Sequence, residues 1–108
     1  AIQTPEDPGN PEKLEKKHIP QISKTNCGLV GNDCQDLHAL MGEIIHPMEE
    51  DHYITVVDFY LDKEFATRVH LTPKSQPAAS VHLKDTSGEL IVIEHCNVHG
   101  NWINSIKL

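Results

Sequence analysis

Two residue types that bind metals lie close together near the end of the chain, Cys96 and His99, within the segment Cys-Asn-Val-His-Gly-Asn-Trp. A thiolate and an imidazole at this spacing can close on one metal ion. Thiolate is a soft ligand and imidazole suits zinc, copper, iron and nickel, so the pair alone does not identify the metal. His18, His46 and His52 lie upstream, so four histidines and one cysteine are available to a single site.

Five donors exceed the four that a tetrahedral zinc site takes. Four imidazoles in a plane with one thiolate below them form a square pyramid, and the sixth position is open. Iron accepts that geometry, and an open position admits a small diatomic molecule. A thiolate opposite that position donates electron density through the metal, as an axial cysteine does in haem proteins. We therefore expect inner-sphere, one-electron chemistry on a small oxygen species.

Two other functions use part of the same set. A blue-copper electron carrier would take His52, Cys96 and His99, but its weak axial methionine is expected after the last histidine, and both methionines lie upstream. It would also leave two histidines unused. A zinc-stabilised binding module would use Cys96 and three histidines. Metal content and colour distinguish the three possibilities.

Composition excludes several classes of function. The 108 residues suffice for one domain, and 9 basic against 16 acidic residues give a formal net charge of -7. So acidic a chain is a poor candidate for binding nucleic acid or an anionic membrane. The longest purely apolar run, at residues 90–93, is far shorter than a membrane span.

The apolar residues are mostly β-branched, and long helix-periodic stretches are scarce, which favours an all-β domain. The folded body begins at His18. Alternation and turn residues predict strands over 35–45, 53–61, 64–71, 78–84 and 89–96, with a short strand after Gly100. In the strand over 64–71, the side chains of Phe65, Val69 and Leu71 are expected to face inward. Trp102 is expected to pack against the site. About seven short strands predict an antiparallel β-sandwich of immunoglobulin-like type.

Residues 1–17 contain three prolines and a basic end, and we expect an extended N-terminal arm with a helical turn near Glu12 to Lys17. Cys27 and Cys34 flank a turn and could form a disulfide, or remain free thiols in a reducing cytosol. A disulfide would favour export. The chain begins at Ala1, which fits either a removed tag or a cleaved leader.

The potential ligands lie beside the ends of predicted strands. His46 follows one strand and His52 precedes the next, while Cys96 ends a strand and His99 lies in the following turn. A sandwich presents a site in this way, because rigid strands hold loop residues at one end. The remaining histidines are expected to be outward or structural; they are His38, His70, His82 and His95.

Three segments, 17–20 (Lys-His-Ile-Pro), 46–54 and 96–102, resemble the signature segments of the superoxide reductase family, which comprises neelaredoxin and the iron-site domain of desulfoferrodoxin. They occur in the family's order and at similar spacing. The resemblance covers roughly residues 17–104, and the spacing H-x27-H-x5-H-x43-C-x2-H is far more specific than Cys-x2-His alone.

The resemblance implies a mononuclear non-haem iron in a β-sandwich domain over residues 18–108. Cys96 would be its axial ligand, and its equatorial ligands would be His18, His46, His52 and His99. It implies reduction of superoxide by Fe(II) to hydrogen peroxide, with re-reduction by a donor such as rubredoxin. Lys17 would attract the anionic substrate and help to supply protons. The family also implies a homo-oligomer, either a dimer or a tetramer, and a cytoplasmic location.

The chain departs from the family pattern at two points. Most members have Glu two residues before the first histidine, where it can occupy the sixth position in the oxidised state; this chain has Lys16 there. Whether Glu15 or Glu12 replaces it stays open. A cysteine-rich segment that would hold a second iron is not found in the sequence, which places the chain with the shorter one-iron members.

Overall fold

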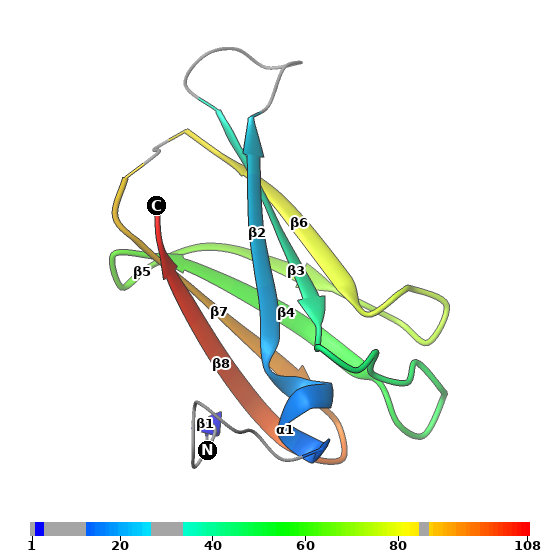
Figure 1. Cartoon of the computed structure of the whole chain (residues 1–108). Helices are drawn as coiled ribbons and strands as arrows, with labels where there is room; N and C mark the ends of the chain where they lie inside the picture. Colours follow the sequence, from blue (N-terminus) through cyan, green and yellow to red (C-terminus); the bar gives the residue numbers. More distant parts are fainter. Residues whose placement is uncertain (1, 4–12, 27–33, 85–86) are drawn as a thin grey trace.

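A computed structural model describes residues 2–3, 13–26, 34–84 and 87–108 (Figure 1). These residues form one short helix and eight strands. The elements in chain order are β1 (Ile2–Gln3), α1 (Lys13–His18), β2 (Pro20–Asn26), β3 (Gln35–Met41), β4 (Ile54–Leu61), β5 (Glu64–His70), β6 (Ala78–Leu83), β7 (Glu89–Cys96) and β8 (Gly100–Lys107).

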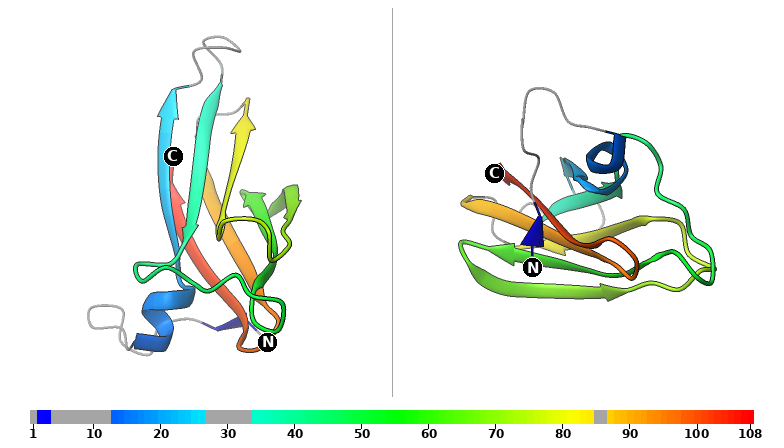
Figure 2. Two further views of the ribbon diagram at one scale, coloured as in Figure 1. Left: turned by 90° about the vertical axis from the view of Figure 1, so that its right-hand side faces the viewer. Right: turned by 90° about the horizontal axis from the view of Figure 1, so that it is seen from below.

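The strands form two sheets that pack face to face. One has five strands in the order β1-β8-β7-β4-β5, and the other has three in the order β2-β3-β6 (Figure 2). All pairings are antiparallel except that of β1 with β8, where Ile2 lies opposite Asn101. The immunoglobulin-like antiparallel sandwich is therefore confirmed, with β1 and β2 as strands outside the predicted ranges.

The core lies between the sheets and follows the predicted alternation. In β3 the side chains of Leu37, Ala39 and Met41 are buried, while those of His38 and Leu40 are exposed. The central strand β4 contributes buried apolar side chains, as do β6 and β7; they are Ile54, Val57, Phe59, Ala79, Val81, Leu90 and Val92. Burying this apolar surface supplies the main driving force for folding.

The prediction that Phe65 faces inward is wrong, because its side chain is 59% exposed. The pairing of β4 with β5 is irregular between Phe59 and Tyr60: Phe59 lies opposite Thr67, but Tyr60 lies opposite Phe65, so Ala66 is an extra residue. Such a bulge shifts the alternation by one position. Phe65 consequently joins Tyr60 on the outer face, with their ring centroids 5.7 Å apart.

The predicted helical turn is present as α1, so residues 13–17 are helical and not extended. The segment is rich in good helix formers, and three of its basic residues, Lys16, Lys17 and His18, lie in the last turn, where the helix dipole favours them. The helix docks against the residues after β3. The N–H of Ile44 donates to the Lys16 carbonyl at 3.0 Å, and a Cβ at Gly42 would lie 2.5 Å from the same oxygen. Gly42 thus permits the close approach of α1.

The predicted strand over 35–45 ends at Met41, where the chain turns towards the residues that precede β4. None of the helices in the described residues is long and apolar enough to cross a membrane.

Candidate metal centre

Three segments that are far apart in the sequence meet at one end of the sandwich. They are the end of α1, the connection between β3 and β4, and the turn between β7 and β8, all at the lower end in Figure 1 and in the left view of Figure 2. His18 is the last residue of α1, and Cys96 is the last residue of β7. His46 and His52 lie in the β3–β4 connection, and His99 directly precedes β8.

The four imidazoles form a closed ring of neighbours. His18 lies 4.6 Å from His46, His46 lies 4.8 Å from His52, His52 lies 5.0 Å from His99, and His99 lies 5.0 Å from His18, measured between ring centroids. Each pair of rings is inclined by 70° to 83°. The edges of the rings therefore meet around a common centre, as the edges of ligands around one ion do.

The thiol of Cys96 completes this cluster. One nitrogen each of His18, His52 and His99 and the sulfur of Cys96 all lie within 4.8 Å of one another. His46 joins them through its Nε2, which lies 3.1 Å from Nε2 of His18. The structure thus brings together all five residues that the sequence singled out as potential ligands.

Several ring nitrogens are directed into the cluster. Nδ1 of His46 lies 2.7 Å from the Pro47 carbonyl, to which it donates, so Nε2 presents its lone pair towards His18. Nε2 of His52 is buried and has no hydrogen-bond partner among the described residues. A buried nitrogen without a partner is costly. A cation among the rings would take these lone pairs, so the donor set fits a metal ion with imidazole and thiolate ligands.

Burial tunes the donors towards their neutral forms. Burial, together with the neighbouring imidazoles, lowers the pKa of His46 from 6.5 to about 4, against the opposing effect of its bond to the Pro47 carbonyl. At neutral pH this ring is therefore ready to bind a metal. Burial also raises the pKa of the Cys96 thiol, while the N–H groups of His99 and Val98 oppose that rise. A nearby cation would favour the thiolate here.

Short backbone contacts hold the ligand loops. The N–H of His46 donates to the Met41 carbonyl at 2.8 Å, which folds the chain back directly after β3. His52 and Glu49 exchange two backbone hydrogen bonds of 3.0 Å and close a tight turn. In the β7–β8 turn, the N–H of His99 donates to the sulfur of Cys96 at 3.4 Å.

Trp102 is packed against the site, as predicted. Its side chain is 3% exposed and stacks on the His18 ring, and its Nε1 donates to the His99 carbonyl at 3.2 Å. One indole thus supports the His18 imidazole and the backbone of His99.

Glu94 is a buried acid that the sequence analysis missed. It lies two residues before Cys96 on the inward face of β7, it is 0% exposed, and neither carboxylate oxygen has a partner among the described residues. Burial raises its pKa to about 9, so it is neutral at pH 7. A charged Glu94 would further raise the pKa of Cys96. The signal that could have revealed it is a single acidic residue between the apolar run 90–93 and Cys96, at an inward position of a strand expected to be buried.

Three of the residues expected around the open position, Glu15, Lys16 and Lys17, lie on α1. Lys17 directly precedes His18 and is half-buried, as is Lys16. Glu15 is 8% exposed on the same helix. Glu12 lies outside the described residues.

The other four histidines do not join the cluster. His38, His70 and His82 are exposed, and His95 points away from Cys96, as predicted. Nε2 of His95 lies 3.0 Å from Asp58, which also accepts two hydrogen bonds from Arg68, and Nδ1 of His95 lies 2.7 Å from Oδ1 of Asn101. The Arg68 bonds hold the pKa of Asp58 below its usual range. This row of polar residues ties the strands together at the base of the β7–β8 turn.

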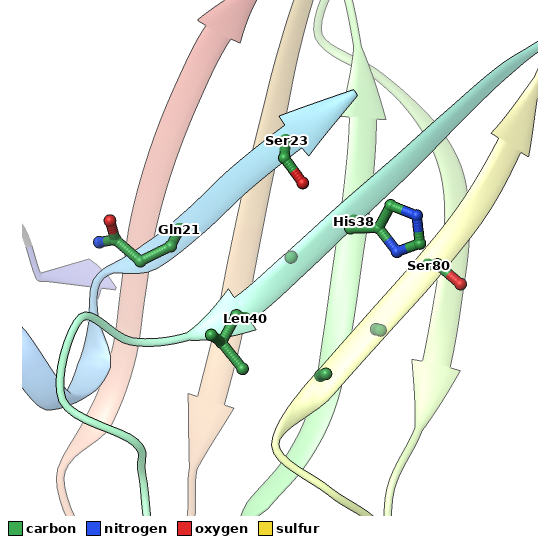
Figure 3. A pocket seen from close by; sticks show the side chains of 8 residues that line it. Gln21, Ser23, His38, Leu40 and Ser80 are labelled. Carbon is green, nitrogen blue, oxygen red and sulfur yellow. The ribbon is translucent and has the colours of Figure 1, made fainter. Parts of the chain in front are cut away.

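Two further features lie elsewhere. Cys34 is disulfide-bonded and Cys96 is free, while Cys27, the expected partner of Cys34, lies outside the described residues. A shallow hollow of about 340 Å³ crosses the outer face of the three-stranded sheet (Figure 3). None of the five clustered residues lines it, so the hollow is separate from the candidate metal centre.

The fold and the cluster define a β-sandwich with a four-histidine, one-cysteine centre at one end. The family model described as Desulfoferrodoxin matches residues 10–105. The chain belongs to the desulfoferrodoxin family.

Individual relatives agree with this assignment. A superoxide reductase from Pyrococcus horikoshii is 30% identical over 105 residues, which cover 86% of this chain and 88% of that protein. A desulfoferrodoxin from Syntrophotalea carbinolica is 38% identical over 91 residues, or 84% of this chain and 64% of that protein. The chain thus spans slightly less than two thirds of such longer relatives. A solved superoxide reductase (neelaredoxin) from Ignicoccus hospitalis is 28% identical, with a TM-score of 0.74 over 99% of this chain and 93% of that one.

Proposed function

We propose that this chain is a superoxide reductase with one mononuclear iron bound by His18, His46, His52, His99 and Cys96. The observation that carries the proposal is the closed ring of four imidazoles beside one free thiol. The relatives named superoxide reductase, which match most of the chain, support it.

Iron bound at this site would supply one electron to superoxide, which with two protons becomes hydrogen peroxide, and an external donor such as rubredoxin would return that electron. The protein's part is to hold the donors in place and in the correct protonation state. Burial keeps the His46 ring neutral, and it keeps the Cys96 sulfur away from water. A thiolate among the donors favours transfer of electron density towards an open position.

The substrate must approach a chain that carries a net charge of -7, which repels an anion. Lys17, beside His18 on α1, would provide the local positive potential that reverses this repulsion. Its ammonium group is also a proton donor of the kind that peroxide formation needs. Lys16 occupies the position at which most members of the resembled family have Glu, and it adds a second cation there.

Two parts of the proposal concern partners. The electron donor is expected to be a small redox protein, and stopped-flow reduction of the oxidised protein by reduced rubredoxin would test it. A homo-oligomer, a dimer or a tetramer, stays a prediction that light scattering would test.

The decisive experiment combines metal analysis, the visible spectrum and pulse radiolysis of the purified protein. We expect about one iron per chain, a thiolate-to-Fe(III) band in the oxidised state, and second-order decay of superoxide to hydrogen peroxide without release of dioxygen. An intense blue copper band, or a colourless zinc protein that leaves superoxide untouched after loading with iron, would contradict the proposal.

A further inference from the structure

Asn97 connects the turn of Cys96 to the residues around His52. Its backbone N–H donates to the Tyr53 carbonyl at 3.2 Å. Its side-chain Oδ1 accepts a hydrogen bond of 2.9 Å from the N–H of Tyr53, and its Nδ2 donates to the Asp51 carbonyl at 3.2 Å. One amide side chain therefore holds the two peptide groups that flank the α-carbon of His52.

Only a short primary amide fits this pattern. It offers a donor and an acceptor on one planar group, and here each meets its complement in the backbone. A carboxylate of the same shape can accept from Tyr53 but cannot donate to Asp51. An alanine retains only the backbone hydrogen bond.

The sheet does not fix His52 in another way. β4 begins at Ile54, and its pairing with β7 is irregular between Ile54 and Val56. The last pair of this ladder joins Ile54 to Cys96. Beyond that pair, His52 has its own turn with Glu49, which is local and does not link it to β7. The hydrogen bonds of Asn97 therefore link the residues on either side of His52 to the end of β7, beyond the last pair of the ladder.

We propose that Asn97 is a positioning residue that fixes the His52 imidazole relative to the Cys96 thiol and so strengthens metal binding, without touching the metal itself. The proposal rests on the metal site assigned above. Residues that orient metal ligands typically contribute 10- to 100-fold to metal affinity. A loss of this size is therefore expected when the side-chain hydrogen bonds are removed.

The test is titration with Co²⁺, whose thiolate charge-transfer band reports Cys96 and whose ligand-field bands report the remaining donors. Four proteins are compared: the unaltered chain, Asn97→Ala, His52→Ala and the double variant. We expect Asn97→Ala to weaken Co²⁺ binding about 10- to 100-fold. The thiolate band should persist, while the ligand-field bands move towards those of His52→Ala. In the His52→Ala background, Asn97→Ala should change the affinity less than about twofold, because residues that act through one another are not additive.

Thr55→Val is the matched control, since Thr55 Oγ1 donates to the His95 carbonyl across the same two strands. It should bind Co²⁺ as the unaltered chain does. Asn97→Asp keeps the acceptor and should recover part of the loss, and it replaces Asn97→Ala if that variant does not fold. The positioning role would be overturned if Asn97→Ala weakened Co²⁺ binding equally with and without His52. It would also be overturned if Thr55→Val weakened Co²⁺ binding as much as Asn97→Ala does. If the unaltered chain gives no thiolate band with Co²⁺, the metal site itself is refuted.

Discussion

The indole of Trp102 stacks on the imidazole of His18, with ring centroids 5.0 Å apart and planes inclined by 24°. The same indole donates to the carbonyl of His99. Two residues proposed as ligands, 81 positions apart in the chain, therefore share one buried support.

Trp102→Phe keeps an aromatic ring under His18 and removes the hydrogen bond to His99. We expect it to lower the free energy of unfolding by about 1–2 kcal/mol. Trp102→Ala also opens a cavity, and a loss of about 3–5 kcal/mol is expected. Chemical denaturation of the metal-free proteins would measure both, and equal losses in the two variants would contradict a supporting role for the ring.

Cys96→Ser replaces the only soft donor of the cluster. The visible thiolate-to-Fe(III) band should disappear, and most of the superoxide reduction should be lost, because the thiolate is the donor expected opposite the open position. Iron content should be measured alongside, so that loss of the metal is distinguished from loss of the ligand. Survival of the band in this variant would mean that Cys96 is not the axial ligand.

Lys17→Ala removes the positive charge beside His18. The second-order rate with superoxide should fall severalfold and become less sensitive to salt, while iron stays bound, because the charge acts on the encounter. Pulse radiolysis at several ionic strengths gives the rate. Lys24→Ala is the control, since Lys24 is exposed on β2, further from the cluster. An equal effect of the two substitutions would remove Lys17 from the mechanism.

The depressed pKa of His46 makes the metal-free fold sensitive to acid. The folded protein keeps this ring neutral down to about pH 4, whereas the unfolded chain binds a proton near pH 6.5. The contribution of His46 to stability is therefore complete above pH 6.5 and is lost as the pH falls towards 4. The loss is roughly 3 kcal/mol at 1.36 kcal/mol per pKa unit. His46→Gln should abolish this part of the pH dependence in denaturation experiments.

The raised pKa of Glu94 acts in the opposite direction. The folded protein keeps the proton up to about pH 9, whereas the unfolded chain releases it near pH 4.5, so stability falls as the pH rises between these values. Between pH 4.5 and 6.5 the effects of His46 and Glu94 oppose each other. Above pH 6.5 the slope comes mainly from Glu94, joined towards pH 9 by the Cys96 thiol, whose pKa is also raised, and Glu94→Gln should flatten most of it. If the free energy of unfolding of Glu94→Gln varied with pH between 7 and 9 as that of the unaltered chain does, Glu94 would not be buried as a neutral acid.

Periodicity and turn chemistry were sufficient to predict the sandwich and the strands that flank the cluster, β3, β4, β7 and β8. The inward positions of β3 and β6 follow from simple alternation, because those strands pair regularly. The same alternation mispredicts the side of β5 on which Phe65 lies, because the bulge at Ala66 shifts the inward positions by one residue. Alternation alone does not reveal a bulge. The pattern also gave no sign of β1, whose two residues are too few to show a period.

The five clustered residues could be predicted because their types are uncommon and their spacing is specific. The supporting residues could not, since they act through contacts that depend on the completed fold. Asn97 meets Tyr53 across 44 positions, and its asparagine reads as an ordinary turn residue in the sequence. The sequence predicts a buried strand around Glu94, but only the structure shows that the carboxyl group itself is buried, which is costly for a charged acid.

The distance along the chain between the clustered residues determines when a metal can be captured. His18 and His99 belong to α1 and to the last turn of the sandwich, so no short stretch of a growing or unfolded chain offers more than two or three of the donors. Closing such long loops is slow compared with local folding, and it must precede any binding by the complete set. Metal loading is therefore expected as the final event in the maturation of this protein, after both sheets have come together.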